Sequence, residues 1–166
     1  MSPLPIIVTS ANDTLDAGAC PSITFATLPG PDGFTTLREA ICAANNTPGL
    51  DIILFHPSLA GTPILLTRTG AFEDQNNTGD LDIRDHLIIQ GLGTTATIIN
   101  GNASDRVFHM PWVGNIDVTF NDLTITNGNL LTSDVGGGIY NGDANLTLNH
   151  VLVENNQGYY GGAIYE

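Results

Sequence analysis

The sequence predicts an all-β fold, a right-handed parallel β-helix with one capping α-helix near its N-terminal end. Three observations support this prediction. A ten-residue line repeats at a constant spacing, short strand-like runs follow one another without helices between them, and a single capped helix precedes them. Each repeat of a solenoid buries its apolar face only against its neighbours, so a repeat of this length is typical of stacked coils.

The repeated line runs from Val118 to Asn127 and again from Leu146 to Asn155, so each residue of the second copy lies 28 positions after its counterpart. Apolar residues fall at the same places in both copies, and both copies end on asparagine. Stacked turns with identical asparagines favour a ladder in which side-chain amides hydrogen-bond from coil to coil. We therefore expect Asn127 and Asn155 to form a stacking ladder.

A second match extends the repeat at a different spacing. A glycine-rich segment returns with Gly137 over Gly161, 24 positions apart. Since the two offsets differ by four residues, the first copy is expected to carry a loop insertion around residues 129–135. The matched positions are the ones that stack, so a specific function is expected where the copies differ.

One helix is expected, from Thr36 to Asn45. Thr36 and Glu39 form a capping box, in which the Thr36 hydroxyl accepts from the Glu39 backbone N–H while the Glu39 carboxylate reaches back to the Thr36 N–H. The following residues place one apolar stripe at spacings of three and four, on Leu37, Ala40, Ile41 and Ala44. Such a helix in front of the coils predicts a cap over the first coil.

After the helix, short β-rich runs separated by Gly, Asn and Asp replace the helical pattern. The absence of helices between them excludes a βαβ sheet, and the runs are shorter than the strands of a hairpin sandwich. The expected strands are residues 52–55, 64–67, 81–83, 87–90, 97–99, 107–110, 116–120, 123–125, 138–140, 146–148, 151–153 and 163–165, after an earlier run at 6–9. Several short strands per repeat predict parallel coils, and parallel connections are almost always right-handed.

The charge balance restricts the partners. The chain has 166 residues, with 17 acidic and 4 basic side chains and a net charge of −13. Binding a polyphosphate or an anionic membrane needs a cationic patch, so nucleic acid is excluded as a partner. No apolar run is long enough to cross a bilayer, so no membrane insertion is expected. Carbohydrate, protein and cations remain as candidate partners.

Cys20 and Cys42 are the only cysteines. An even pair favours a disulfide that closes a loop of about twenty residues and contributes roughly 3 kcal/mol in the chain-entropy model. Two free buried thiols in a reducing compartment are the alternative. A composition rich in Asn, Thr and Gly suits a secreted or cell-surface protein.

One local group of residues offers catalytic chemistry. Asp80 and Asp82 share one face of a strand, and Arg84 follows on the same side. In this alternative they serve a polysaccharide lyase or a glycoside hydrolase. Asp80, Asp82 and Asp85 are candidate ligands for Ca²⁺; no other cofactor is expected. The simpler interpretation places these residues on an outward, solvated sheet face without a catalytic role.

Structural roles are favoured for the histidines and are considered beside ligand binding for five aromatic residues. Four histidines lie at least twenty residues apart and are expected at the surface or in turns; they are His56, His86, His109 and His150. Five aromatic residues offer a carbohydrate-stacking platform, and a ladder of stacked rings explains them equally well. They are Trp112, Tyr140, Tyr159, Tyr160 and Tyr165.

The segment from Asp32 to Asn45, followed by residues 48–55, resembles the N-terminal signature of bacterial surface and secreted β-helix proteins named for a Cys-Ser-Leu-Arg-Glu-Ala motif. Short motifs typical of the β-helix coils of that family also occur in polymorphic outer-membrane proteins and in pectate-lyase-like repeats. Similar motifs are found here at residues 87–93, 123–128 and 136–141. The motif's leading Cys-Ser is Thr35-Thr36 here. The resemblance implies an extracellular, adhesin-like, non-enzymatic protein and carries over no catalytic residue.

We therefore expect a lead-in with its capping helix over residues 1–50 and β-helix coils over residues 51–166. The expected function is that of a non-catalytic cell-surface or secreted module that binds surfaces, carbohydrate or protein. A polysaccharide-active enzyme and a capping fragment without activity are the alternatives. Glu166 lies one strand into a coil, so we expect either a longer solenoid or self-association through the open coil.

Overall fold

The computed structural model describes residues 5–70 and 73–166, so the first four residues of the predicted lead-in lie outside it. Strands predominate in the described part, with α1 as its one α-helix. The elements are β1 Ile6–Val8, α1 Leu37–Asn45, β2 Asp51–Phe55, β3 Ile64–Leu65, β4 Leu81–Asp82, β5 Leu87–Gln90, β6 Ile98–Asn100, β7 Phe108–Met110, β8 Asp117–Thr126, β9 Asn129–Val135, β10 Ile139–Asn141, β11 Asn145–Glu154, β12 Gln157–Tyr160 and β13 Ile164–Tyr165. Short 3₁₀ helices lie at Cys20–Ser22, Phe25–Thr27 and Pro57–Leu59.

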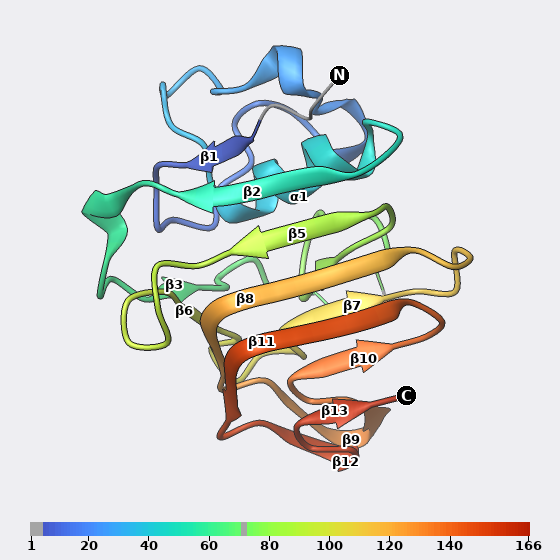
Figure 1. Ribbon diagram of the computed structural model, residues 1–166. Coiled ribbons are helices and arrows are strands. Elements are labelled where there is room, and N and C mark those ends of the chain that lie inside the picture. Colours follow the sequence, from blue (N-terminus) through green and yellow to red (C-terminus); the bar gives the residue numbers. More distant parts are fainter. Residues whose placement is uncertain (1–4, 71–72) are drawn as a thin grey trace.

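The described strand pairs are all parallel and build three sheets. The largest has the order β1-β2-β5-β8-β6-β3 with β11 beside β8, the second the order β13-β10-β7-β4, and the third joins β12 to β9. The windings lie one below another from β1 to β13 (Figure 1). Parallel stacking of successive windings is consistent with a parallel β-solenoid, and the expected all-β character is confirmed.

Two long strands turn a corner of the winding. The first half of β8 pairs with β5 and its second half with β6, so the largest sheet curls. The bend falls at Asp122 in β8 and at His150 in β11, where φ is 53° and 51°. The two strands pair from Asn145 opposite Asp117 onward, which confirms the predicted offset of 28 residues. The two strands predicted within each copy are therefore one bent strand.

Columns of apolar side chains fill the interior. Each column takes one residue from each stacked strand, so every side chain packs on those above and below. The columns are Ile6, Ile53, Ile89, Phe120 and Leu148; Ile64, Ile99, Ile125 and Val153; and Leu81, Phe108, Ile139 and Ile164. Burial is complete or nearly so in the middle of each column. Since one winding cannot cover its own apolar face, stacking is what stabilises the fold.

One column begins with a carboxylate. Asp51 pairs with Leu87, and Leu87 pairs with Val118. Asp51 is 6% exposed, and its Oδ2 atom has no hydrogen-bond partner among the described residues. Burial, together with the negative charge of Asp85, raises the pKa of the Asp51 carboxyl. The site thus disfavours the charged form that an aspartate adopts at neutral pH.

Replacing Asp51 with valine is expected to raise the free energy of unfolding by about 1–3 kcal/mol at neutral pH, because a buried unpaired acceptor is removed. Above about pH 4 the folded protein binds more protons at Asp51 than the unfolded chain does, so wild-type stability falls as pH rises through this window. The gain should therefore be larger at pH 7 than at pH 4 in urea titrations. Glu154→Gln, at an exposed carboxylate, is the control; an equal gain at both pH values would contradict the assignment.

The helix α1 lies beside β1 and β2 at the N-terminal end of the stack (Figure 1). Its predicted capping box is present, with Thr36 accepting from the Glu39 N–H and the Glu39 carboxylate accepting from the Thr36 N–H. Residues 37–44 are all buried, which a single apolar stripe did not predict. The lead-in and residues 76–80 account for the difference, because both pack on the polar side of the helix.

The lead-in is fastened to α1 by a disulfide and by ion pairing. Cys20 and Cys42 are bonded, as one of the two alternatives predicted. Arg38 lies against Asp13 with 2.6 Å between Nε and Oδ1, and both side chains are almost completely buried. The Glu39 carboxylate also accepts from the backbone N–H groups of Asp16 and Ala17. The helix therefore joins lead-in and coils into one structure.

The glycine-rich repeat has a different register from the predicted one. Ile139 pairs with Ile164, so the offset is 25 and Gly136 matches Gly161, at φ of 72° and 61°. The difference from the first offset is thus three residues, not four. The extra residues lie in β9, which is a strand with a register shift against β12, and not a loop insertion.

Asn127 and Asn155 directly follow β8 and β11 at equivalent corners, with φ of 56° and 54°. Left-handed backbone of this kind favours asparagine at both places. Both side chains are exposed. The hydrogen bond that joins stacked asparagines at 2.8 Å runs instead from Asn149 to Asn121, on the outer side of the same two strands.

Candidate functional site

The outer face of the sheet β4-β7-β10-β13 carries a row of polar and aromatic side chains. Asp82 pairs with His109, His109 with Tyr140, and Tyr140 with Tyr165. The two tyrosine rings are stacked at 5.7 Å between centroids with 7° between their planes, and the His109 ring lies 5.1 Å from that of Tyr140. An imidazole thus stands between a carboxylate and a pair of phenols.

The loop of residues 73–79 folds over the first strand of this face. Asn76 and Asp82 exchange hydrogen bonds, from the Asn76 N–H to Asp82 Oδ2 at 2.8 Å and from the Asp82 N–H to Asn76 Oδ1 at 3.1 Å. The Glu73 carboxylate accepts from the N–H groups of Asn77 and Thr78. Burial alone would raise the pKa of Glu73, but these bonds outweigh it and lower the pKa. The loop is therefore held closed by its own backbone.

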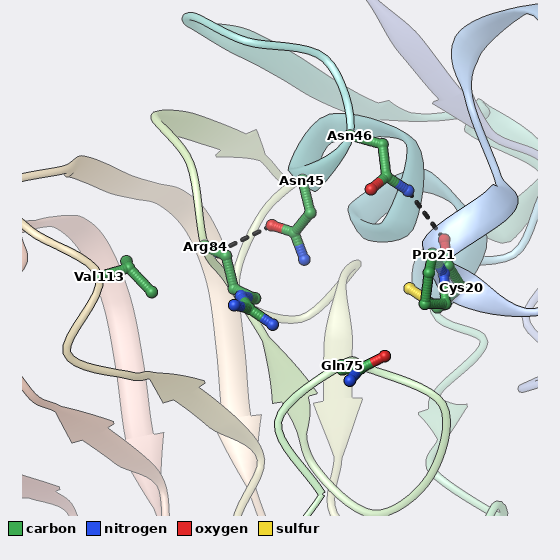
Figure 2. A pocket seen from close by; sticks show the side chains of 7 residues that line it. All are labelled: Cys20, Pro21, Asn45, Asn46, Gln75, Arg84 and Val113. Carbon is green, nitrogen blue, oxygen red and sulfur yellow. Dashed lines mark hydrogen bonds between the residues drawn. The ribbon is translucent and has the colours of Figure 1, made fainter.

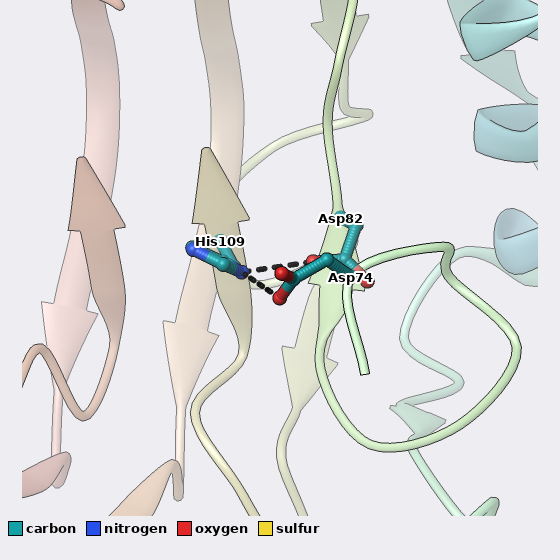
Figure 3. A group of neighbouring side chains, drawn as sticks. All are labelled: Asp74, Asp82 and His109. Carbon is teal, nitrogen blue, oxygen red and sulfur yellow. Dashed lines mark hydrogen bonds and ion pairs between the residues drawn. The ribbon is translucent and has the colours of Figure 1, made fainter. Parts of the chain in front are cut away.

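This loop brings a second carboxylate to His109 (Figure 3). The Nδ1 atom of His109 lies 2.9 Å from Oδ1 of Asp82 and 3.6 Å from Oδ1 of Asp74. Asp82 is completely buried, His109 nearly so, and Asp74 is exposed. Burial raises the pKa of Asp82, against the hydrogen bonds from His109 and Asn76, which lower it. Among the described residues, these three form the group of acidic and histidine side chains that can hold a metal ion.

A buried ion pair lies beside this group. Asp80 Oδ2 is 2.6 Å from Nε of Arg106, which is also 4.0 Å from Asp105. The Arg106 guanidinium lies 5.4 Å from the centre of the Tyr140 ring. Burial raises the pKa of Asp80 well above its ordinary value, and the charges of Asp82 and Asp105 add to this, while Arg106 and Arg38 oppose it. The pair fixes Arg106 against the aromatic row.

Two cavities open on this face. The first, of about 470 Å³, is lined by Asp74, Arg84, Arg106, His109, Trp112 and Tyr140 among others. The second, of about 540 Å³, lies beside the end of α1 and reaches from Cys20 to Val113; it is also lined by Asn45, Asn46, Gln75 and Arg84 (Figure 2). Both cavities share Arg84 and Val113. We call the two together the Arg84 groove.

The Arg84 groove has an aromatic wall. Trp112 is 73% exposed, and its indole N–H donates to the Tyr140 hydroxyl at 3.3 Å. Arg84 is exposed and donates to the backbone carbonyl of Asp74 at 2.9 Å. Asn45 accepts from the Arg84 backbone N–H, which fixes the chain at the junction of the two cavities. The groove thus combines a free aromatic face with a cation and amide groups.

The predicted catalytic set is not assembled as one group. Asp80 and Asp82 are 4% and 0% exposed, so the expectation of a solvated sheet face is wrong, because Arg106 pairs with Asp80 and the loop of residues 73–79 covers Asp82. Asp80 pairs with Arg106, Asp82 with His109, and no ion pair within the described residues joins Arg84 to either carboxylate. Asp80, Asp82 and Arg84 therefore each contact a different partner.

The predicted Ca²⁺ ligands also separate. Asp85 lies before β5 and accepts from the N–H of His86 at 2.7 Å and from that of Gly49, in the turn before β2, at 3.2 Å. In the described part of the chain, Asp82 forms its potential metal group with Asp74 and His109 and not with Asp80 or Asp85. The placement of His109 in a turn or at the surface was likewise wrong. Its strand pairs with β4, and this pairing has no repeat in the sequence that reveals it.

The remaining aromatic residues divide between two places. Tyr140 and Tyr165 form the stacked pair that one interpretation predicted, while Trp112 lies at the edge of the Arg84 groove. Tyr159 and Tyr160 contact each other edge to face on β12, in a different sheet.

The described helices are all too short to cross a bilayer as an apolar span. The disulfide fits an oxidising, extracellular environment. Comparisons with models of known protein families, with curated proteins and with solved structures found no match to this chain.

Proposed function

We propose that the chain forms coils of a right-handed parallel β-helix in a secreted or cell-surface protein and acts as a non-catalytic module that binds carbohydrate in the Arg84 groove. The observation that carries this proposal is the exposed Trp112 ring, held by its hydrogen bond to Tyr140 at the edge of a cavity. An aromatic ring beside polar groups at the edge of a cavity is typical of a ligand-binding site. The proposed right-handedness rests on the general preference of parallel connections.

The chemistry of the groove favours a sugar polymer. The C–H face of a sugar ring packs on an aromatic face, while hydroxyl groups need hydrogen-bond partners such as Arg84, Asp74 and Gln75 around it. All three line the groove. Two cavities that meet at Arg84 accommodate a chain of rings better than a single small molecule. The net charge of −13 disfavours polyphosphates as ligands but does not disfavour uncharged sugar polymers.

Trp112→Ala is expected to weaken binding of an oligosaccharide by roughly tenfold, because stacking on an aromatic ring contributes about 1–2 kcal/mol. A panel of soluble plant and bacterial polysaccharides on a glycan array would identify the ligand, and calorimetry would give its affinity. Tyr159→Ala is the control, since Tyr159 is 61% exposed but lies on β12, away from the groove. The proposal fails if no glycan binds, or if both variants bind a glycan as the wild type does.

An enzyme on the same scaffold is the second candidate, and the contact of Asp82 with His109 at the cavity favours it. A carboxylate that orients an imidazole is a common arrangement for a general base. The candidate base would then be His109, with Asp82 as the residue that orients it, and not the set of Asp80, Asp82 and Arg84. Release of uronate from pectin or alginate that is lost in Asp82→Asn would overturn the non-catalytic proposal.

A further inference from the structure

The side chains of Asp74, Asp82 and His109 meet at one point from three separate places. Asp82 lies in β4, His109 in β7 and Asp74 in the loop of residues 73–79 (Figure 3). One oxygen or nitrogen atom from each lies within 4.8 Å of the other two. Asp82 and His109 come from adjacent paired strands, so the sheet itself fixes their spacing.

Hydrogen bonding alone does not explain this convergence. The Nδ1 atom of an imidazole carries at most one proton, and Asp82 at 2.9 Å is within hydrogen-bond range. Asp74 is directed at the same nitrogen at 3.6 Å, beyond that range. Its side chain is 64% exposed and has water as an alternative partner. Two carboxylates beside one imidazole nitrogen form an arrangement that a shared cation stabilises.

We propose that Asp74, Asp82 and His109 bind a divalent first-row transition metal ion, with Zn²⁺ as the best match. Bonds of about 2.0–2.2 Å from zinc to nitrogen and oxygen place neighbouring ligand atoms roughly 3–3.5 Å apart in a tetrahedron. The two distances from His109 Nδ1, 2.9 and 3.6 Å, lie close to this range. An imidazole ligand favours zinc over Ca²⁺, which takes six to eight oxygen ligands.

The surroundings support a metal site in two ways. The second oxygen of Asp82 accepts from the Asn76 N–H at 2.8 Å, so the ligand carboxylate is oriented by a neighbour as metal ligands usually are. Asp74 and His109 also line the cavity of about 470 Å³. Three protein ligands leave a position of the ion open toward this cavity for water or a ligand hydroxyl. The proposal does not depend on carbohydrate binding.

The test is calorimetry of the full chain with ZnCl₂ after EDTA treatment and dialysis. We expect one Zn²⁺ per chain, and Ca²⁺ at least tenfold weaker. His109→Gln should weaken Zn²⁺ binding by roughly tenfold or more, because loss of a ligand costs at least as much as loss of its supporting contacts. Asp74→Asn should also weaken it, and this exposed loop position keeps the variant folded. Co²⁺ should give a visible absorption band that His109→Gln lacks.

His86 provides a matched control. Its Nδ1 atom lies 3.4 Å from the Asp117 carboxylate, so it repeats the histidine and carboxylate pairing with one carboxylate. His86→Gln should leave Zn²⁺ affinity unchanged. The proposal is overturned if His109→Gln and Asp74→Asn bind Zn²⁺ as tightly as the wild type, if His86→Gln alone loses the ion, or if Ca²⁺ binds more tightly than Zn²⁺.

Discussion

Replacing Arg38 with methionine is expected to lower the free energy of unfolding by about 3–5 kcal/mol, because it leaves the buried Asp13 carboxylate without its partner. The guanidinium also donates to the backbone carbonyls of Gly79 at 2.8 Å and Asp80 at 2.9 Å. Arg38 thus connects the lead-in, α1 and the loop in front of β4. Urea titration followed by circular dichroism measures the loss.

Arg84→Met is the matched control, since Arg84 is exposed and its guanidinium donates to one backbone carbonyl. It should cost about 0.5 kcal/mol or less. A double variant with Asp13→Leu should recover part of the Arg38→Met loss, because no unpaired charge stays buried. Recovery will be incomplete, since Asp13 also accepts from the N–H groups of Thr67 and Arg68. An Arg38→Met loss as small as that of the control would refute the assigned role.

Local patterns predicted the elements that depend on neighbours in sequence. The capping box joins Thr36 to Glu39, three positions later in the sequence, and its predicted hydrogen bonds are present in the structure. The offset of 28 residues predicted the pairing of β8 with β11 because the inward-facing apolar positions and one asparagine coincide in the two strands. A periodic pattern of side chains is sufficient for this purpose, since stacked strands must bury the same face.

The glycine-rich repeat shows where such patterns fail. The matching glycines predicted Gly137 over Gly161, whereas the strands pair Ile139 with Ile164. Glycine has no side chain that must face inward, so it does not fix the register. The positive φ of Gly136 and Gly161 identifies the equivalent positions, and backbone angles are not visible in a sequence.

The candidate metal site could not be predicted from the sequence for a related reason. Asp82 and His109 lie 27 residues apart and belong to strands that carry no recognisable repeat. Asp74 reaches them only because Glu73 and Asn76 close a loop through backbone hydrogen bonds. The burial of Arg38 is comparable, since its partners lie 25 to 42 residues away. Sequence spacing predicts which residues are neighbours within one strand or helix. The contacts of Asp74, Asp82, His109 and Arg38 join different windings, so they depend on how the windings stack.

Phe120→Ala is expected to lower the free energy of unfolding by about 3–5 kcal/mol, because it opens a cavity in a fully buried column. Phe120 is 0% exposed and stacks between Ile89 and Leu148. Its ring also lies 4.7 Å from that of Phe108, which belongs to the opposite sheet. The substitution therefore weakens both the stacking of windings and the contact between two walls of the interior.

Leu152→Ala is the control that distinguishes the effect of burial from the effect of a position in the stacked strands. Leu152 lies in β11, which pairs with β8, but it is 44% exposed on the outer face. Removing its side chain should lower the free energy of unfolding by about 0.5 kcal/mol or less.

If the windings unfold as one cooperative unit, Phe120→Ala will move the urea midpoint with an unchanged slope, since the surface exposed on unfolding is the same. A second transition would instead mean that the windings on either side of Phe120 unfold separately, as nearest-neighbour coupling permits in stacked repeats. Equal losses for the two substitutions would show that the column through Phe120 does not hold the fold together.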